Sequence, residues 1–148
     1  MDSRGFTLLE LIVVLIILTL AAGTVIPRIG AGSKRMADRE FLQEYVQTLK
    51  RARIRAMNSG EITAFRIRSS ERLYDIKLPP EKAIPDNVDI YADNLDRDPE
   101  TQDRLVLFYP DGSFSGNDME IVFDDQRSFR ISIHPLLGTI RWSKVEER

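Results

Sequence analysis

Residues 6–26 read FTLLELIVVLIILTLAAGTVI, an apolar run of 21 residues in which Glu10 is the only charged side chain. At 1.5 Å per residue, a helix of this length would measure about 31 Å, which matches the roughly 30 Å hydrocarbon core of a bilayer. Of the 21 basic and 23 acidic residues in the chain, only three precede Pro27. We therefore expect a membrane-spanning helix at 6–26 that is followed by a polar body.

The composition excludes several classes of protein. The chain has 148 residues, a comfortable size for one domain, and its net charge of -2 provides no general basic field for nucleic acid. It has no cysteine, so disulfide scaffolds, thiolate metal clusters and cysteine nucleophiles are excluded. The single histidine, His134, cannot form a multi-histidine metal site. Because the sequence also lacks a nucleophile motif, a phosphate loop and zinc-ligand spacing, we expect no catalytic residue, no metal site and no cofactor.

Three interpretations of the apolar run compete. A cleaved secretory signal would have an apolar core of about 7–15 residues and an exit of small residues. Thr19-Leu20-Ala21 could serve as that exit, but the run is longer and contains an acid. A plain single-pass anchor explains the length but not Glu10, since a carboxylate inside a membrane costs at least about 2.5–3.5 kcal/mol and usually has a partner.

The third interpretation uses the residues around the start of the run. Residues 4–10, RGFTLLE, resemble the class III signal of type IV pilins and type II secretion pseudopilins. The resemblance implies that a prepilin peptidase removes a leader at 1–5 by cutting between Gly5 and Phe6, and that Phe6 is then N-methylated. It also implies that the helix stays as membrane anchor and filament core. Phe6 and Glu10 are an i, i+4 pair on one helix face, so Glu10 could neutralise the N-terminal ammonium of a neighbouring subunit.

The charges that flank the run conflict with this interpretation. Arg4 is the only basic residue before it, whereas Arg28, Lys34 and Arg35 follow it. The positive-inside rule would place the body in the cytoplasm. The resemblance implies the opposite: a single-pass protein of the bacterial inner membrane with its head in the periplasm. We follow the resemblance.

Apolar residues continue at helical spacing beyond Pro27. Apolar residues recur as a stripe from Phe41 to Met57 with Arg, Lys, Gln and Glu between them. This pattern predicts an amphipathic helix at 27–60. Asn58-Ser59-Gly60 supplies a C-terminal stop for this helix.

From residue 61 the apolar period changes to two, which predicts a β-rich head at 61–148. We expect a hairpin of two strands joined across Ser69-Ser70-Glu71, followed by five further strands. The predicted strands are 62–68, 73–78, 88–91, 105–109, 119–123, 129–133 and 138–142. One long helix followed by short strands predicts an α+β fold, with an antiparallel sheet packed on the amphipathic half of the helix.

Residues 108–117, FYPDGSFSGN, form a second specific motif. They resemble the turn of the H-type minor pseudopilins and of the related FimT-like minor pilins, although Asn117 stands where the pattern usually has glycine. On its own, any Pro-Asp-Gly hairpin would explain the segment. The resemblance extends to Gly138-Thr139-Ile140-Arg141-Trp142. The turn residues that match are Pro110, Asp111, Gly112, Ser113, Ser115 and Gly116.

Together the motifs imply a minor pseudopilin of the type II secretion system, closest to the H-type subunit. Such a protein is a non-enzymatic component of the periplasmic pseudopilus, at the tip or in its initiation. The implied partners are other minor and major pseudopilins, the prepilin peptidase, the inner-membrane assembly platform, the lipid bilayer and secreted substrates. The alternative is a FimT-like minor type IV pilin that acts in pilus assembly or DNA uptake.

Three weaker patterns are explained by ordinary structural roles. The acids in residues 93–100 have a spacing that could ligate calcium, but the loop lacks the glycine and the distal Glu of an EF-hand, so we expect a solvated loop. We expect His134 to be a turn residue. Basic residues cluster at 50–55, but the net charge is negative and acids dilute the basic residues near the C-terminus, so we do not expect DNA as a partner.

Overall fold

The computed structural model describes residues 7–145 with gaps at 77–79, 117, 125–126 and 135–137, and the side chains of residues 21–31 also lie outside the described part. The chain divides into two compact units, Met1–Phe41 and Leu42–Arg148. Each unit is described by itself.

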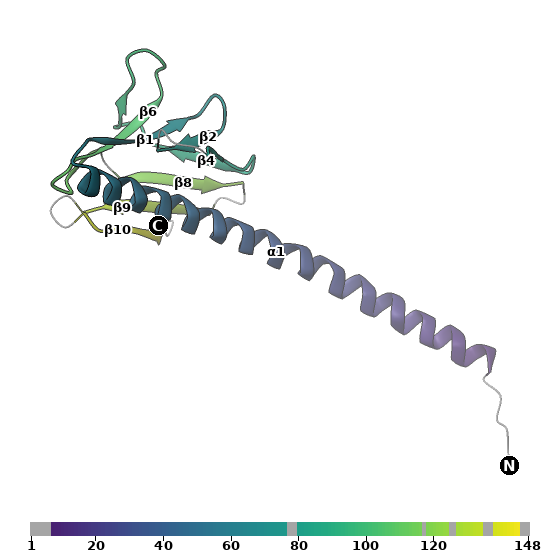
Figure 1. Cartoon of the computed structure of the whole chain (residues 1–148). Helices are drawn as coiled ribbons and strands as arrows, with labels where there is room; N and C mark the ends of the chain where they lie inside the picture. Colours follow the sequence, from purple (N-terminus) through teal and green to yellow (C-terminus); the bar gives the residue numbers. More distant parts are fainter. Residues whose placement is uncertain (1–6, 77–79, 117, 125–126, 135–137, 146–148) are drawn as a thin grey trace. The chain divides into compact units, whose positions relative to one another are not determined.

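A single helix, α1 (Leu8–Ser59), runs from the first unit into the second (Figure 1). The predicted helix is confirmed over this range, and its backbone is helical through Pro27. It ends where predicted, because Gly60 has a φ of 70° and donates its amide to the carbonyl of Ala56 at 3.1 Å. A left-handed glycine after the last turn is a common helix stop.

The described residues of the second unit contain ten strands, which form two antiparallel sheets. Sheet A has the order β3-β2-β1-β6-β5, with β7 paired to β6. Its strands are β1 (Thr63–Arg68), β2 (Leu73–Asp75), β3 (Lys82–Ala83), β5 (Asp96–Arg97), β6 (Arg104–Phe108) and β7 (Phe114–Ser115). Sheet B has the order β10-β9-β8-β4. Its strands are β4 (Val88–Tyr91), β8 (Met119–Phe123), β9 (Ser128–Ile133) and β10 (Ile140–Lys144).

The α+β class is confirmed, and each of the seven predicted strands corresponds to an observed one. The strands divide between two sheets instead of forming one. The prediction missed β3, β5 and β7, since a strand of two residues is too short to show a period of two. The predicted strand at 73–78 ends at Asp75, and its residues 77–78 lie outside the described part.

The core of the second unit lies between the apolar face of α1 and the two sheets. Tyr45 joins all three: its ring centroid lies 5.2 Å from that of Phe65 on β1 and 4.9 Å from that of Tyr74 on β2. Its hydroxyl donates to the sulfur of Met119 on β8 at 3.6 Å. Burial raises the pKa of Tyr45, so the phenol stays neutral in the core.

The remaining helix residues of the predicted stripe follow the same face, with one exception. Met57 is 47% exposed, so its place in the stripe was predicted wrongly. It lies near the C-terminal end of α1, where the buried face of the helix is reduced to Ala56. The buried helix residues of the second unit are Leu42, Tyr45, Val46, Thr48, Leu49, Ala52 and Ala56.

Candidate functional site

The N-terminal turn of α1 is built around Thr7 and Glu10. Thr7 precedes the helix and acts as its N-cap, because its hydroxyl accepts the amide hydrogen of Glu10 at 3.3 Å. Glu10 is therefore the third helical residue, and Thr7-Leu8-Leu9-Glu10 has the spacing of a capping box. The exposed carboxylate of Glu10 lies at the positive end of the helix dipole.

The predicted processing residues, Gly5 and Phe6, lie outside the described part of the chain. The pairing of Glu10 with the ammonium at Phe6 therefore remains a prediction. The N-cap role of Thr7 was not predicted from the sequence. The Thr-x-x-Glu spacing of residues 7–10 is typical of a helix N-terminus and could have indicated it.

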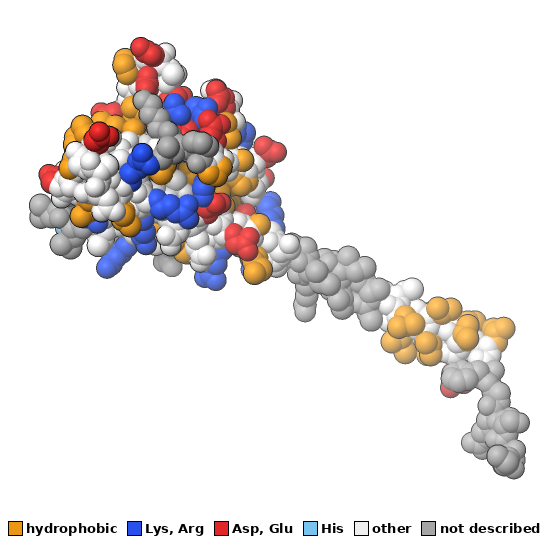
Figure 2. Space-filling model, in the orientation of Figure 1, with side chains coloured by type: hydrophobic (Ala, Val, Ile, Leu, Met, Phe, Trp, Pro, Cys, Tyr) orange, Lys and Arg blue, Asp and Glu red, His pale blue; other side chains and the backbone are white. Residues whose placement is uncertain are grey.

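The first turns of α1 carry apolar side chains on every side, and Figure 2 shows hydrophobic side chains on the visible face of this segment. Their exposure runs from 45% at Ile12 to 78% at Leu8. Within the described residues, no helix combines the length and apolarity needed to cross a membrane. The predicted membrane segment at 6–26 also includes Phe6 and the side chains of residues 21–26, which are outside the described part.

The Pro-Asp-Gly motif forms a tight turn between β6 and β7. Tyr109 donates its amide to the carbonyl of Ser113 at 3.0 Å, and Gly112 has a φ of 82°. The carboxylate of Asp111 accepts two hydrogen bonds from Ser113, one from the hydroxyl at 2.6 Å and one from the amide at 2.9 Å. These bonds lower the pKa of Asp111, which keeps the carboxylate charged and the turn closed.

The second half of the motif connects to a neighbouring strand. The hydroxyl of Ser115 donates to the carboxylate of Asp96 on β5 at 2.8 Å. Gly116 has a φ of 131°, and an added Cβ there would lie 2.9 Å from the side chain of Leu95. The motif therefore holds a short piece of sheet A together, while Pro110 is exposed and Asn117 lies outside the described part.

Arg53 of α1 brings the two motifs of the head together. Its Nε donates to the carbonyl of Gly112 at 3.0 Å. An added Cβ on Gly138, which precedes β10, would lie 2.3 Å from the same Nε and 2.4 Å from the Cζ of Arg53. One guanidinium group thus lies against a turn of sheet A and a turn of sheet B.

From the sequence, Arg53 was expected to be one of several surface charges, and its contact with the two glycines was not predicted. The sequence contains only a weak indication of this contact. Arg53 directly follows the buried Ala52, so its side chain lies at the margin of the apolar face of the helix. Both glycines have positive φ, at 82° for Gly112 and 59° for Gly138, so each position favours glycine for its backbone as well as for the close contact.

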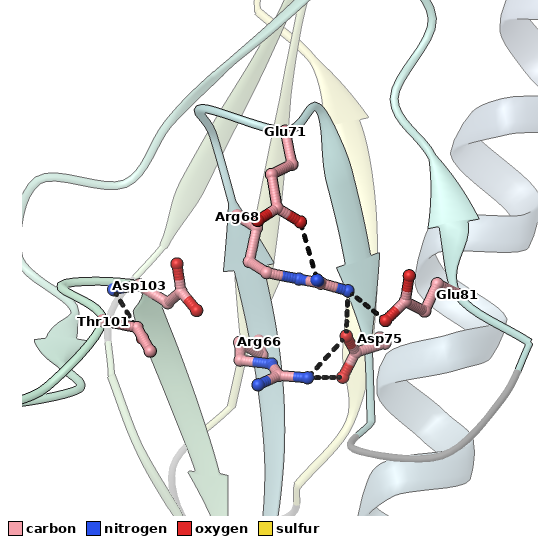
Figure 3. Close-up of polar contacts among 7 residues, drawn as sticks. All are labelled: Arg66, Arg68, Glu71, Asp75, Glu81, Thr101 and Asp103. Carbon is pink, nitrogen blue, oxygen red and sulfur yellow. Dashed lines mark hydrogen bonds and ion pairs between the residues drawn. The ribbon is translucent and has the colours of Figure 1, made fainter.

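A charged cluster covers the outer face of the β1–β2 hairpin (Figure 3). The carboxylate of Asp75, on β2, is almost completely buried and accepts hydrogen bonds from Arg66 at 3.0 and 3.2 Å and from Arg68 at 2.9 Å. Arg68 also pairs with Glu71 at 2.7 Å and with Glu81 at 2.6 Å. The hydrogen bond to Glu81 raises the pKa of Arg68.

The cluster follows from strand register. Arg66 and Asp75 are direct cross-strand partners, and Phe65 and Ile67 on the opposite face point into the core. Opposite charges at such a pair stabilise a hairpin. The predicted turn at Ser69-Ser70-Glu71 would place Tyr74 opposite Arg66. The observed connection is one residue longer, which places Asp75 there instead.

Three of the four acidic side chains at 93–100 interact with other groups of the protein, and Asp96 among them accepts the hydroxyl of Ser115. Asp93 pairs with Arg104 at 3.3 Å, and Asp98 accepts the backbone amides of Glu100 at 3.0 Å and Thr101 at 3.2 Å. Within the described residues, no group of three or more acidic, histidine or cysteine side chains is placed to hold a metal ion. His134 lies in the β9–β10 turn, where its amide donates to the carbonyl of Thr139 at 2.9 Å.

Comparisons with known proteins give one match to a family and one match to a structure. Residues 1–26 match the family described as the prokaryotic N-terminal methylation motif. No curated protein matches the chain. The fold is similar to that of the minor pseudopilin EpsH from the type 2 secretion system of Vibrio cholerae, with a TM-score of 0.53 and 14% sequence identity. The similarity covers 72% of this chain and 95% of that chain.

Proposed function

We propose that the chain is a minor pseudopilin of a type II secretion system, closest to the H-type subunit. In this role it is a structural, non-enzymatic component of the pseudopilus, near the tip or in its initiation, and it supports the export of folded proteins. The observation that carries the proposal is the combination of an N-terminal methylation motif at 1–26 with a head that has the fold of a minor pseudopilin.

The proposed site residues follow from this role. A prepilin peptidase cuts between Gly5 and Phe6 and leaves Phe6 as an N-methylated end. The exposed apolar side chains of α1 then lie in the inner membrane before assembly and against neighbouring helices in the filament. Glu10 pairs with the ammonium of a neighbouring subunit, and the head lies in the periplasm. The partners are other pseudopilins, the assembly platform and the bilayer.

Coexpression with a prepilin peptidase tests the processing step. We expect the intact mass to fall by the mass of residues 1–5 and to rise by one methyl group. A variant with Gly5→Asp is the matched control, and we expect it to keep its full mass. A full-length wild-type chain, or a cut near Ala21, would reject the class III signal.

Topology is tested separately with reporters fused after Arg148. We expect a periplasm-dependent reporter to be active and a cytoplasm-dependent one to be silent. Activity of the cytoplasmic reporter alone would reject the proposed localisation and would favour the orientation that the flanking charges predict.

The alternative is a FimT-like minor type IV pilin that takes part in DNA uptake. The exposed basic residues Lys50, Arg51 and Arg55 on α1 are the observation in its favour. We expect only weak binding of duplex DNA at physiological salt. Submicromolar binding with a steep salt dependence would favour the alternative, because the number of phosphate contacts sets the salt dependence.

A further inference from the structure

The two edge strands of sheet B, β4 and β10, differ in whether their outward backbone groups have hydrogen-bond partners. At the β4 edge, the amide of Asp124 donates to the carbonyl of Asn87, so the alternation of an antiparallel pair turns the carbonyls of Val88 and Ile90 away from β8. Arg72 donates to the carbonyl of Val88 at 2.7 Å, and Arg104 donates to that of Ile90 at 3.2 Å. Two guanidinium groups from sheet A thus close this edge.

The β10 edge is open in the described part of the chain. The amide of His134 donates to the carbonyl of Thr139, and the amide of Val145 donates to that of Ser128, both at 2.9 Å. The same alternation then directs the backbone groups of residues 140, 142 and 144 away from β9. No strand of the described chain pairs with β10 on this side. An unpaired strand edge is a template for another strand.

A groove lies at the start of this open edge. It has a volume of about 430 Å³ and lies between α1, which contributes Lys50, Arg53 and Ile54, and the start of β10, which contributes Thr139, Ile140 and Arg141. Three of these residues are basic and none is acidic. Ile54 is 56% exposed, so the helix side of the groove also offers an apolar surface.

The basic character continues along the helix. A second hollow is lined by Arg51, Ile54 and Arg55 and shares Ile54 with the groove. Figure 2 shows Lys and Arg side chains gathered over this half of α1. In contrast, Arg72 and Arg104 at the β4 edge are paired with acids, since Arg72 lies near Asp89 and Arg104 lies near Asp93.

We propose that the groove between α1 and β10 binds an extended acidic segment of a partner protein, which adds to sheet B as a fifth strand. Backbone groups of the segment pair with the outward groups of β10, as in other cases of strand addition. Because side chains alternate along a strand, apolar residues of the segment lie against Ile54 while its carboxylates on the other face lie beside Arg141.

The proposal is independent of the proposed function, because it rests on the open edge of β10 and the groove at its start. Its test does not require cleavage of the leader. The probe is the fluorescein-labelled peptide Glu-Val-Glu-Val-Glu-Val-Glu, titrated with the full chain in a mild detergent and followed by fluorescence anisotropy. We expect saturable binding. We also expect binding to weaken at least about tenfold with Arg141→Glu or Ile54→Glu, a loss of about 1.4 kcal/mol.

Two controls separate strand addition from general attraction. The same peptide with every backbone amide methylated keeps its charge but has no N–H group to offer on either edge, so its binding should be lost. The variant Arg97→Glu makes the same change of charge on the exposed strand β5 of sheet A and should bind the peptide like the wild type. Thermal melting followed by circular dichroism checks that each variant is folded.

The proposal is overturned by any of four results. These are the absence of saturable binding, equal binding of the methylated peptide, unchanged binding by both groove variants, and displacement of the peptide by duplex DNA at a lower concentration than unlabelled peptide. The last result would assign the groove to nucleic acid.

Discussion

At the scale of single residues, Glu10 serves the helix terminus and the proposed assembly step at once. We predict that Glu10→Ala leaves membrane insertion and leader cleavage intact, since removing a carboxylate from an apolar helix makes insertion easier by about 2.5–3.5 kcal/mol. Assembly should fail, because the ammonium of a neighbour would be buried without a counter-charge, which is unfavourable by several kcal/mol. Cleavage, membrane localisation and crosslinking to other pseudopilins are measured in the same cells.

Glu10→Gln is the matched variant for this test. It keeps a hydrogen-bond acceptor at the helix terminus but removes the charge, so crosslinking should fall between that of the wild type and that of Glu10→Ala. Wild-type crosslinking in Glu10→Ala would contradict the pairing. Loss of cleavage alone would show that the acid serves the peptidase.

The contact between Arg53 and Gly138 gives a second prediction at this scale. We predict that Gly138→Ala destabilises the head by more than the roughly 1–2 kcal/mol that a left-handed backbone costs a residue with a Cβ. The excess arises because the new Cβ would lie 2.3 Å from Nε of Arg53, so the arginine side chain must shift and lose its hydrogen bond to the carbonyl of Gly112. Urea unfolding measures the difference.

Gly60→Ala is the control for backbone strain alone. Its φ of 70° is close to the 59° of Gly138, and no atom lies within 4 Å of an added Cβ. We expect the excess cost of Gly138→Ala over Gly60→Ala to vanish in an Arg53→Ala background. An excess that persists there would show that Arg53 is not its cause.

At the scale of elements, Asp75 joins the two strands of the β1–β2 hairpin. We predict that Asp75→Asn lowers the free energy of unfolding by about 2–3 kcal/mol, because it leaves Arg66 and Arg68 without their shared carboxylate. The loss should stay below the 3–5 kcal/mol of a fully buried pair, since the two arginine side chains are 21% and 14% exposed. Chemical denaturation gives the value.

Glu71→Gln is the matched control for this prediction, because Glu71 pairs with the same Arg68 but its side chain is 56% exposed. An exposed ion pair contributes about 0–1 kcal/mol, so this variant should melt nearly like the wild type. Equal losses in the two variants would show that burial of Asp75 does not set the strength of the cluster.

At the scale of the whole molecule, the sheets and the second half of α1 form their own core. We predict that removal of residues 1–27 leaves a soluble fragment that is monomeric or weakly associated and that melts cooperatively. Leu42–Arg148 is a compact unit in its own right, and nearly all charges of the chain follow the deleted segment. Light scattering and a thermal melt provide the measurement.

A chain that lacks only residues 1–5 is the control for the deletion. It keeps the exposed apolar side chains of the first turns of α1 and should need detergent to stay in solution. Aggregation of the shorter fragment, or a broad melt without a cooperative transition, would contradict an independent core.

The sequence by itself determined the features that depend on neighbours along the chain. The extent of α1 follows from the spacing of apolar residues and from Gly60, and the seven longer strands follow from a period of two. The N-terminal methylation motif is also local, since the residues that match it are contiguous at 1–26. Local spacing sets these features because backbone geometry alone decides which side chains share a face.

Only the tertiary structure decided which distant segments meet. The division into two sheets, the place of Arg53 between Gly112 and Gly138, and the closure of the β4 edge by Arg72 and Arg104 all join residues far apart in sequence. A strand has the same apolar period of two in either sheet, so the sequence pattern does not assign it to one of them. A charged residue at the margin of a helix face has the same sequence pattern as any surface charge. Such contacts depend on the packing of whole elements, which local spacing does not encode.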